Sequence, residues 1–174
     1  MRGRVLGAAA LAAALAIGTT ACGGGNPKPA PASDSSPSND ASGDTGQAEA
    51  VRTARLWIDA LNASSESLDA SSLRKLSTRT CEACGSIADY ITQIGSQGGK
   101  ITGGEWLDPK FTVRRASNDF VVRADILVKP QQIRESRSSA AKQFPGGADT
   151  PKQFTVTRSG GKWLVSKLEQ EDTL

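Results

Sequence analysis

The sequence predicts an α+β fold in which three N-terminal helices pack on a curved, mostly antiparallel sheet of about five strands. Apolar residues recur at helical spacing over the first part of the region after residue 46. Over the last part they alternate with polar residues, as they do in half-buried strands. A segregated order of helices followed by strands is typical of α+β folds, in which the helices cover one face of the sheet.

Three helices are expected first. An amphipathic helix over residues 48–63 has an apolar face formed by Val51, Ala54, Trp57, Ile58 and Leu61. A short second helix follows, which Asp69 can cap and which carries Leu73 and Leu76. The third helix ends near Gly95, and its apolar face is formed by Ile87, Tyr90, Ile91 and Ile94. The spacing therefore predicts that Tyr90 packs in the core.

The strands are expected after residue 100. Residues 101–107 and 110–116 are read as two strands that break near Asp108-Pro109. Residues 120–129 place every second side chain, from Phe120 to Val128, on one apolar face. Two alternating runs around Gly160-Gly161 predict a closing hairpin over residues 152–169. The polar residues 135–150 are expected to form an exposed loop.

The N-terminal segment is typical of a secretory signal peptide, predicted over residues 1–21. A short basic stretch precedes an uncharged run of thirteen residues, 5–17, which is too short for a good membrane span of ~20 residues. Small residues then lead to Cys22, as in the lipobox of bacterial lipoproteins, with Thr19 where leucine is usual. The alternative is ordinary secretion with cleavage near Ala21 and a free Cys22.

The sequence therefore predicts a lipoprotein whose Cys22 carries the diacylglycerol and acyl chains, such as palmitate, that hold it in the cell membrane. Two or more chains give stable anchoring. The Gly-, Pro- and Ser-rich segment 22–46 is expected to be a disordered tether, and residues 47–174 a single globular domain. The expected location is extracytoplasmic, on the outer face of the cytoplasmic membrane.

Cys81 and Cys84 form a C-x-x-C pair, and four interpretations compete. A structural disulfide suits an oxidising exterior and leaves an even count once Cys22 is acylated. A redox-active pair is the second interpretation. A metal site would need further cysteine or histidine ligands, which the sequence does not contain. Two free thiols are the least expected state outside the cell. The structural disulfide is favoured.

Composition removes several classes of function. The chain has no histidine, which excludes serine–histidine and cysteine–histidine catalysis and histidine-ligated zinc. The net charge of +3 is too small to indicate a nucleic-acid partner. No cofactor and no metal site are predicted, and no catalytic motif is present.

The sequence resembles an actinobacterial lipoprotein family built on a domain of unknown function. Four features carry this resemblance: the helix that contains Trp57, the "CEAC" motif, the segment "GSQGGKITGGEW" and the "GGKWLV" hairpin. The order of elements is similar to that of nuclear-transport-factor-2-like proteins. This resemblance implies a cone, in which a curved sheet wraps around helices and can form a pocket. It implies no activity, since that fold hosts both enzymes and binding modules.

Three functional hypotheses follow. The favoured one is a non-catalytic binding or accessory module at the cell envelope, with a small ligand or an envelope protein as partner. The second is a small enzyme that uses a carboxylate in a pocket formed by Trp57, Asp59, Tyr90, Trp106 and Asp125. The third is an envelope thiol–disulfide oxidoreductase acting through Cys81 and Cys84. The default role is core packing for Trp57, Tyr90 and Trp106. For Asp59 it is solvation, and for Asp125 it is a surface ion pair with Arg123.

Overall fold

The computed structural model describes residues 41–149 and 151–171, and their side chains from residue 45 onward. The helices are α1 (Ala41–Ser67), α2 (Ser71–Lys75) and α3 (Glu82–Ser96). The strands are β1 (Gly98–Gly103), β2 (Trp106–Ala116), β3 (Asp119–Val128), β4 (Gln131–Ser136), β5 (Lys142–Phe144), β6 (Gly147–Ala148), β7 (Lys152–Ser159) and β8 (Lys162–Gln170). Helices precede strands, and the predicted α+β fold class is confirmed.

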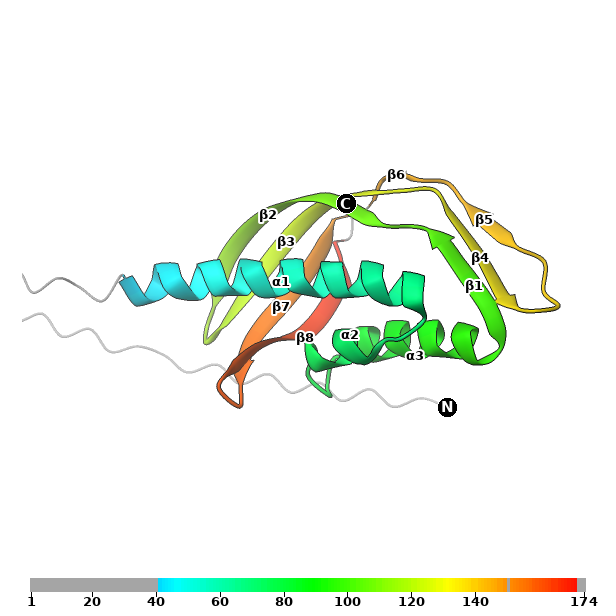
Figure 1. The fold of residues 1–174 in the computed structure, drawn as a ribbon. Helices are drawn as coiled ribbons and strands as arrows, with labels where there is room; N and C mark the ends of the chain where they lie inside the picture. Colours follow the sequence, from blue (N-terminus) through cyan, green and yellow to red (C-terminus); the bar gives the residue numbers. More distant parts are fainter. Residues whose placement is uncertain (1–40, 150, 172–174) are drawn as a thin grey trace, which may run out of the picture. The chain divides into compact units, whose positions relative to one another are not determined.

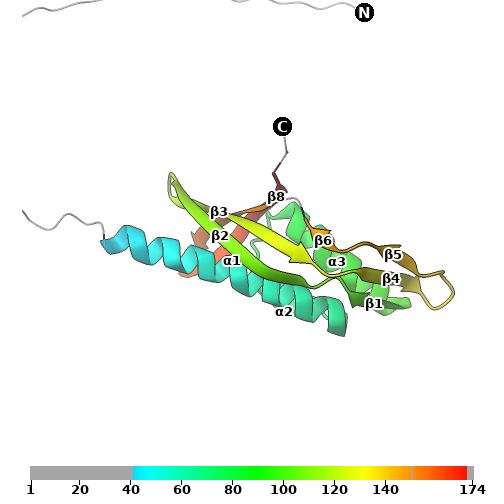
Figure 2. The ribbon, with the colours of Figure 1, turned by 90° about the horizontal axis from the view of Figure 1, so that it is seen from above.

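The described strands form two antiparallel sheets. The larger has the order β2-β3-β7-β8, with β6 paired to the end of β3, and the smaller has the order β1-β4-β5. The larger sheet curves around α1, while α3 lies against β1, β4 and β8 (Figure 1). Seen from above, α1 runs along the larger sheet, and the smaller sheet extends away from the start of α1 (Figure 2). The helices therefore occupy the concave side of a curved sheet.

One hydrophobic core joins the concave face of the larger sheet to the inner faces of the helices. On β3 every second residue from Phe120 to Ile126 is buried, as the alternation predicted. Phe154 and Val156 of β7 are fully buried beside them. The predicted apolar face of the first helix supplies its share of this core through Ala54, Trp57, Ile58 and Leu61. Each large apolar side chain contributes about 1.5–3 kcal/mol on burial, which fixes the face of the sheet that turns inward.

The strand predicted over residues 101–107 is wrong in its extent. β1 ends at Gly103, and Trp106 begins β2. Gly103 has φ +69°, and a Cβ there would lie 2.1 Å from the carbonyl oxygen of Pro130, so the chain turns where only glycine fits. The break predicted at Asp108-Pro109 is a shift of register inside the continuous strand β2.

The smaller sheet was not predicted. Residues 131–136 and 142–144 form β4 and β5, partly inside the segment expected to be a loop. Only Ile133 is buried in these two strands, so they show no alternating apolar pattern. The pairing of β4 with β1 and β5 holds them, which is a tertiary effect. The closing hairpin of β7 and β8 was predicted and is confirmed.

The first helix is longer than residues 48–63 and begins inside the predicted tether, 22–46. α1 starts at Ala41, and Gly46 lies against the ring of Phe120, where a Cβ would be 2.8 Å away. The folded domain therefore begins before residue 47. The predicted signal segment, Cys22 and most of the tether lie outside the described residues. Within the part that the structure describes, no helix is long and apolar enough to cross a bilayer.

Candidate functional site

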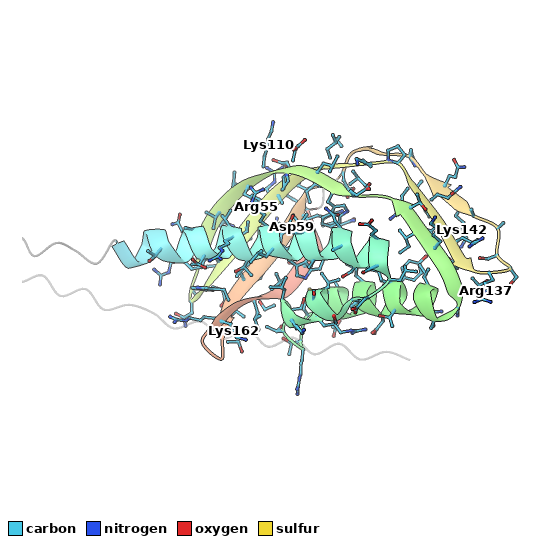
Figure 3. All side chains as sticks on the ribbon, viewed as in Figure 1. Arg55, Asp59, Lys110, Arg137, Lys142 and Lys162 are labelled. Carbon is cyan, nitrogen blue, oxygen red and sulfur yellow. A yellow bond between two sulfur atoms is a disulfide. The ribbon has the colours of Figure 1, made fainter. Side chains whose placement is uncertain are left out.

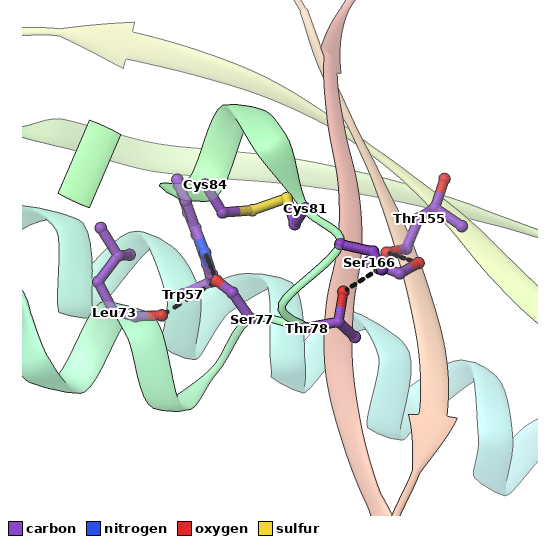
Figure 4. The surroundings of a disulfide bond; sticks show 9 residues. Trp57, Leu73, Ser77, Thr78, Cys81, Cys84, Thr155 and Ser166 are labelled. Atoms are coloured by element: carbon purple, nitrogen blue, oxygen red, sulfur yellow. Dashed lines mark hydrogen bonds between the residues drawn. A yellow bond between two sulfur atoms is a disulfide. The ribbon is translucent and has the colours of Figure 1, made fainter. Parts of the chain in front are cut away.

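The predicted pocket around Trp57 and Trp106 is filled by the core. Trp57 is fully buried, with its ring centroid 5.5 Å from that of Phe154 and 6.2 Å from that of Trp106. Its indole N–H donates a hydrogen bond to Ser77 Oγ at 2.9 Å (Figure 4). Asn62 of α1 holds Trp106 by two hydrogen bonds of 3.0 Å to the backbone N–H and carbonyl group. Both tryptophans therefore fasten α1 to the sheet.

The three polar residues of the predicted pocket lie apart on the surface. Asp59 is exposed on α1 (Figure 3). Asp125 is on the convex face of β3 and pairs with Arg123 at 3.0 Å. Tyr90 is 41% exposed, so its predicted core position is wrong. α3 instead buries Ala88, Ile91 and Ile94, which turns Tyr90 toward solvent.

Cys81 and Cys84 are joined by a disulfide at the start of α3 (Figure 4). The segment before it is tied to the edge of the larger sheet, because Thr78 N–H donates to Val165 O and Val165 N–H donates to Leu76 O, both at 2.9 Å. A cleft of about 400 Å³ lies beside the bond. Both cysteines are no more than 3% exposed. This burial favours a structural role, since reactive thiols are partly exposed.

Replacing both cysteines with serine is expected to lower the free energy of unfolding by about 2 kcal/mol, because the closed loop is very short. Urea unfolding of the oxidised protein and of the Cys81→Ser/Cys84→Ser variant measures the difference. Mass spectrometry of a non-reduced digest should show one linked peptide. Ready turnover of a disulfide substrate by the native protein would contradict a structural role.

Tyr90, Glu135 and Lys142 form a polar cluster between α3 and the smaller sheet. Tyr90 O–H donates to Glu135 Oε1 at 3.4 Å, and Lys142 Nζ donates to the same oxygen at 2.9 Å. Burial raises the pKa of Tyr90, and the Glu135 carboxylate adds to the rise. The hydrogen bond from Lys142 lowers the pKa of Glu135, and Glu135 in turn raises the pKa of Lys142. Near neutral pH the cluster is an ion pair beside a neutral phenol.

These shifts give the pH dependence of the cluster. The pKa of Glu135 is depressed in the folded protein, so its contribution to stability is present above the ordinary carboxyl pKa. It is lost as the pH falls through the folded value. For Lys142 the folded pKa is raised, so its contribution is lost as the pH rises through that value.

Tyr90 is the only tyrosine, so tyrosinate absorbance reports this side chain alone. The Glu135→Gln variant is expected to titrate at lower pH than the native protein, because the neighbouring anion is gone. It should still titrate above the ordinary tyrosine value, because burial is the larger cause of the rise. Glu66→Gln, a change at an exposed site on α1, serves as the control. An unchanged titration in Glu135→Gln would show that the two groups do not interact.

Lys152 is a buried charged residue that was not predicted from the sequence. It lies at an inward position of β7, opposite Ala124, and its side chain is 5% exposed. Its Nζ pairs with Asp149 Oδ2 at 2.9 Å and lies 5.7 Å from the ring centroid of Trp106. The alternation of Lys152, Phe154 and Val156 was the available signal. The ion pair fastens the start of β7 to the segment that carries β6.

A polar groove runs over the outer face of the smaller sheet. Lys100 of β1 lies directly opposite Arg134 of β4, and with Thr102, Gln132 and Ala141 they line a volume of about 310 Å³. Both cations are exposed, and neither has a carboxylate within ion-pair distance among the described residues. Like charges directly opposite each other destabilise a sheet. An anion bound in the groove would relieve that repulsion.

The described residues contain no group of three or more acidic or cysteine side chains placed to hold a metal ion. The two unpaired cations make the groove the candidate site, and its donors suit a phosphate or carboxylate group. No sequence signal identified it, because β4 was not predicted.

No family model matches the sequence, and neither does any curated protein. Among solved structures, the chain is similar to a nuclear-transport-factor-2-like protein with a cystatin-like fold from Novosphingobium aromaticivorans, with TM-score 0.46 and 16% identity over 82% of this chain and 94% of that chain. It is also similar to the intermembrane-space region of a chloroplast protein (TM-score 0.46, 11% identity, 68% and 94% covered). The association domain of C. elegans CaMKII is a third neighbour (TM-score 0.40, 16% identity, 75% and 97% covered). Likenesses at this level carry no inference about activity.

Proposed function

We propose that this protein is an extracytoplasmic lipoprotein whose folded domain is a non-catalytic binding or accessory module of the cell envelope. Acylated Cys22 would hold it on the outer face of the cytoplasmic membrane. The order of basic, apolar and small residues before Cys22 supports this proposal.

The observation that carries the binding role is the filled concave face of the sheet. Trp57, Phe154, Val122 and Val156 are each fully buried where a cone-shaped enzyme would need space for a substrate. The one charged side chain buried there, Lys152, is held by Asp149. This packing supports recognition on the outside of the sheet as the role of the domain.

The groove of Lys100 and Arg134 is the proposed contact for the ligand. Two adjacent cations with the hydroxyl of Thr102 and the amide of Gln132 suit an envelope component that carries phosphate or carboxylate groups. Because both cations of the groove are exposed, it suits a segment of a polymer or an acidic side chain of a partner.

Membrane fractionation and intact mass test the anchor. The native protein, expressed in a bacterium that acylates lipoproteins, should remain with the membrane and carry acyl mass. The Cys22→Ala variant should lack that mass and leave the membrane fraction. Native protein without acyl mass in the medium would contradict the anchor.

Amide chemical shifts test the groove. Adding inorganic phosphate to the labelled protein should shift the signals of Lys100 and Arg134 in a saturable way, and matched additions of sodium chloride should not. The Lys100→Gln/Arg134→Gln variant should lose the response. Lys75→Gln/Lys110→Gln, which removes two exposed cations elsewhere, is the matched control. Equal loss in both variants would mean that net charge alone attracts the anion.

A further inference from the structure

One end of the domain brings together the β2–β3 turn, the β7–β8 turn and the first turns of α1. Phe120 marks this end, because it follows the turn between β2 and β3 and its ring lies against Gly46 of α1. The same ring is 5.6 Å from that of Trp163, which follows the turn between β7 and β8. We name this surface the hairpin end and define it by Arg114, Arg115, Arg158, Lys162 and Trp163.

The hairpin end is basic and carries one half-buried aromatic side chain. Arg115 lies opposite Phe120, and Arg158 lies opposite Trp163. Lys162 directly follows the turn between β7 and β8 (Figure 3). All four basic side chains are exposed, and none of them has a carboxylate within ion-pair distance among the described residues. Asp119 is the acidic residue of the two turns. The first turns of α1 contain two further acids, Asp44 and Glu49, of which Glu49 pairs with Arg52.

The chain that leads to Cys22 joins the domain at this end. α1 begins at Ala41, so eighteen residues separate it from Cys22. If this part of the predicted tether behaves as a coil, its r.m.s. span is about 21–25 Å. The surface nearest the start of α1 is therefore the part of the domain that an anchor at Cys22 brings closest to the bilayer.

We infer that the hairpin end is a membrane-contacting surface, which holds the domain against anionic phospholipid headgroups. The inference rests on the proposed anchoring through Cys22. Each lysine or arginine near an anionic bilayer raises partitioning about fivefold, and the attraction extends over a screening length of about 8 Å. Tryptophan favours the same headgroup region, since its ring is apolar and its N–H is polar. Contact at this end would leave the groove of Lys100 and Arg134, on the smaller sheet, directed away from the bilayer.

Vesicle co-sedimentation tests this inference without the anchor. All chains begin at residue 22 and carry Cys22→Ser, so neither an acyl group nor the apolar run of residues 5–17 contributes, and the tether is the same in each. Vesicles of phosphatidylcholine are compared with vesicles of phosphatidylcholine and phosphatidylglycerol in equal parts. The test variant is Arg114→Gln/Arg158→Gln/Lys162→Gln, which spares Arg115 because that side chain stacks on Phe120. The control variant, Lys75→Gln/Arg79→Gln/Lys110→Gln, removes the same charge from exposed positions elsewhere.

The test variant is expected to lose at least about tenfold of its partitioning to the anionic vesicles, while the control variant keeps it. Neither should change on neutral vesicles, and circular dichroism should show both folded. Equal partitioning of the native and test chains would overturn the inference, and so would an equal loss in the control. If the aspartates of the tether cover the hairpin end, the native and test chains will partition equally, which overturns the inference. Failure of the anchor appears separately, as missing acyl mass at Cys22 in cells.

Discussion

Replacing Trp57 with alanine is expected to lower the free energy of unfolding by about 3–5 kcal/mol, the range for truncating a buried large aromatic side chain. Trp57 is fully buried and contacts Phe154 and Trp106, so its loss opens a cavity between α1 and the larger sheet. Ser77 Oγ also loses the hydrogen bond that the indole N–H donates to it. Because small domains are stable by about 5–15 kcal/mol in total, the variant should be close to unfolding. Urea unfolding followed by far-ultraviolet circular dichroism measures the change.

Two further variants separate the causes of this effect. Ser77→Ala keeps the ring contacts and removes the acceptor of the indole N–H, together with the hydrogen bond that Ser77 Oγ donates to Leu73 O. It should cost about 1–3 kcal/mol, mainly for a buried indole donor left without a partner. Trp163→Ala truncates the same type of side chain where it is only half-buried, and should cost less than Trp57→Ala. An equal cost at both tryptophans would contradict the central position assigned to Trp57.

The second large effect is expected at the ion pair of Lys152 and Asp149. The Asp149→Asn variant leaves a buried ammonium group without its carboxylate and should cost roughly 2–3 kcal/mol. This is less than the cost for a fully buried pair, because the side chain of Asp149 is 33% exposed. Thermal and urea unfolding at neutral pH measure the loss.

Lys152→Met is the informative partner of that variant. Methionine keeps most of the volume beside Trp106 and removes the buried charge, so stability should change by no more than about 1 kcal/mol, in either direction. The lost contact of the ammonium with the ring accounts for about 0.5–1 kcal/mol of any decrease. If Lys152→Met costs as much as Asp149→Asn, the ion pair itself makes a net favourable contribution.

The features with the strongest local sequence pattern are the ones that were predicted correctly. The inward face of β3, from Phe120 to Ile126, was predicted because deep burial of one side of a strand imposes an alternating pattern. The hairpin around Gly160-Gly161 was predicted for a similar reason, since two alternating runs flank a turn signal. The pairing of Cys81 with Cys84 was favoured by counting cysteines, and the disulfide is present.

The missed features depend on contacts between segments that are distant in the sequence. β4 and β5 have a single buried side chain, Ile133, so their pattern carries no strand signal before β1 pairs with them. The side-by-side placement of Lys100 and Arg134 depends on that register and was invisible in the sequence. Tyr90 was assigned to the core because its spacing fits an apolar stripe, but a neighbouring strand supplies Glu135 as a polar partner.

The sequence by itself determined the class of fold, the inward face of the first helix and the strands that line the core. It also determined which chemistries are excluded, because a chain without histidine cannot use it in any fold. Only the tertiary structure decided that the concave face is filled, that Asp59, Tyr90 and Asp125 lie apart, and that Lys152 is buried. The physical reason is that local periodicity records which side of an element is apolar. The partners that fill a cavity, pair a charge or align two cations come from other elements, and their register is set only when the sheet closes around α1.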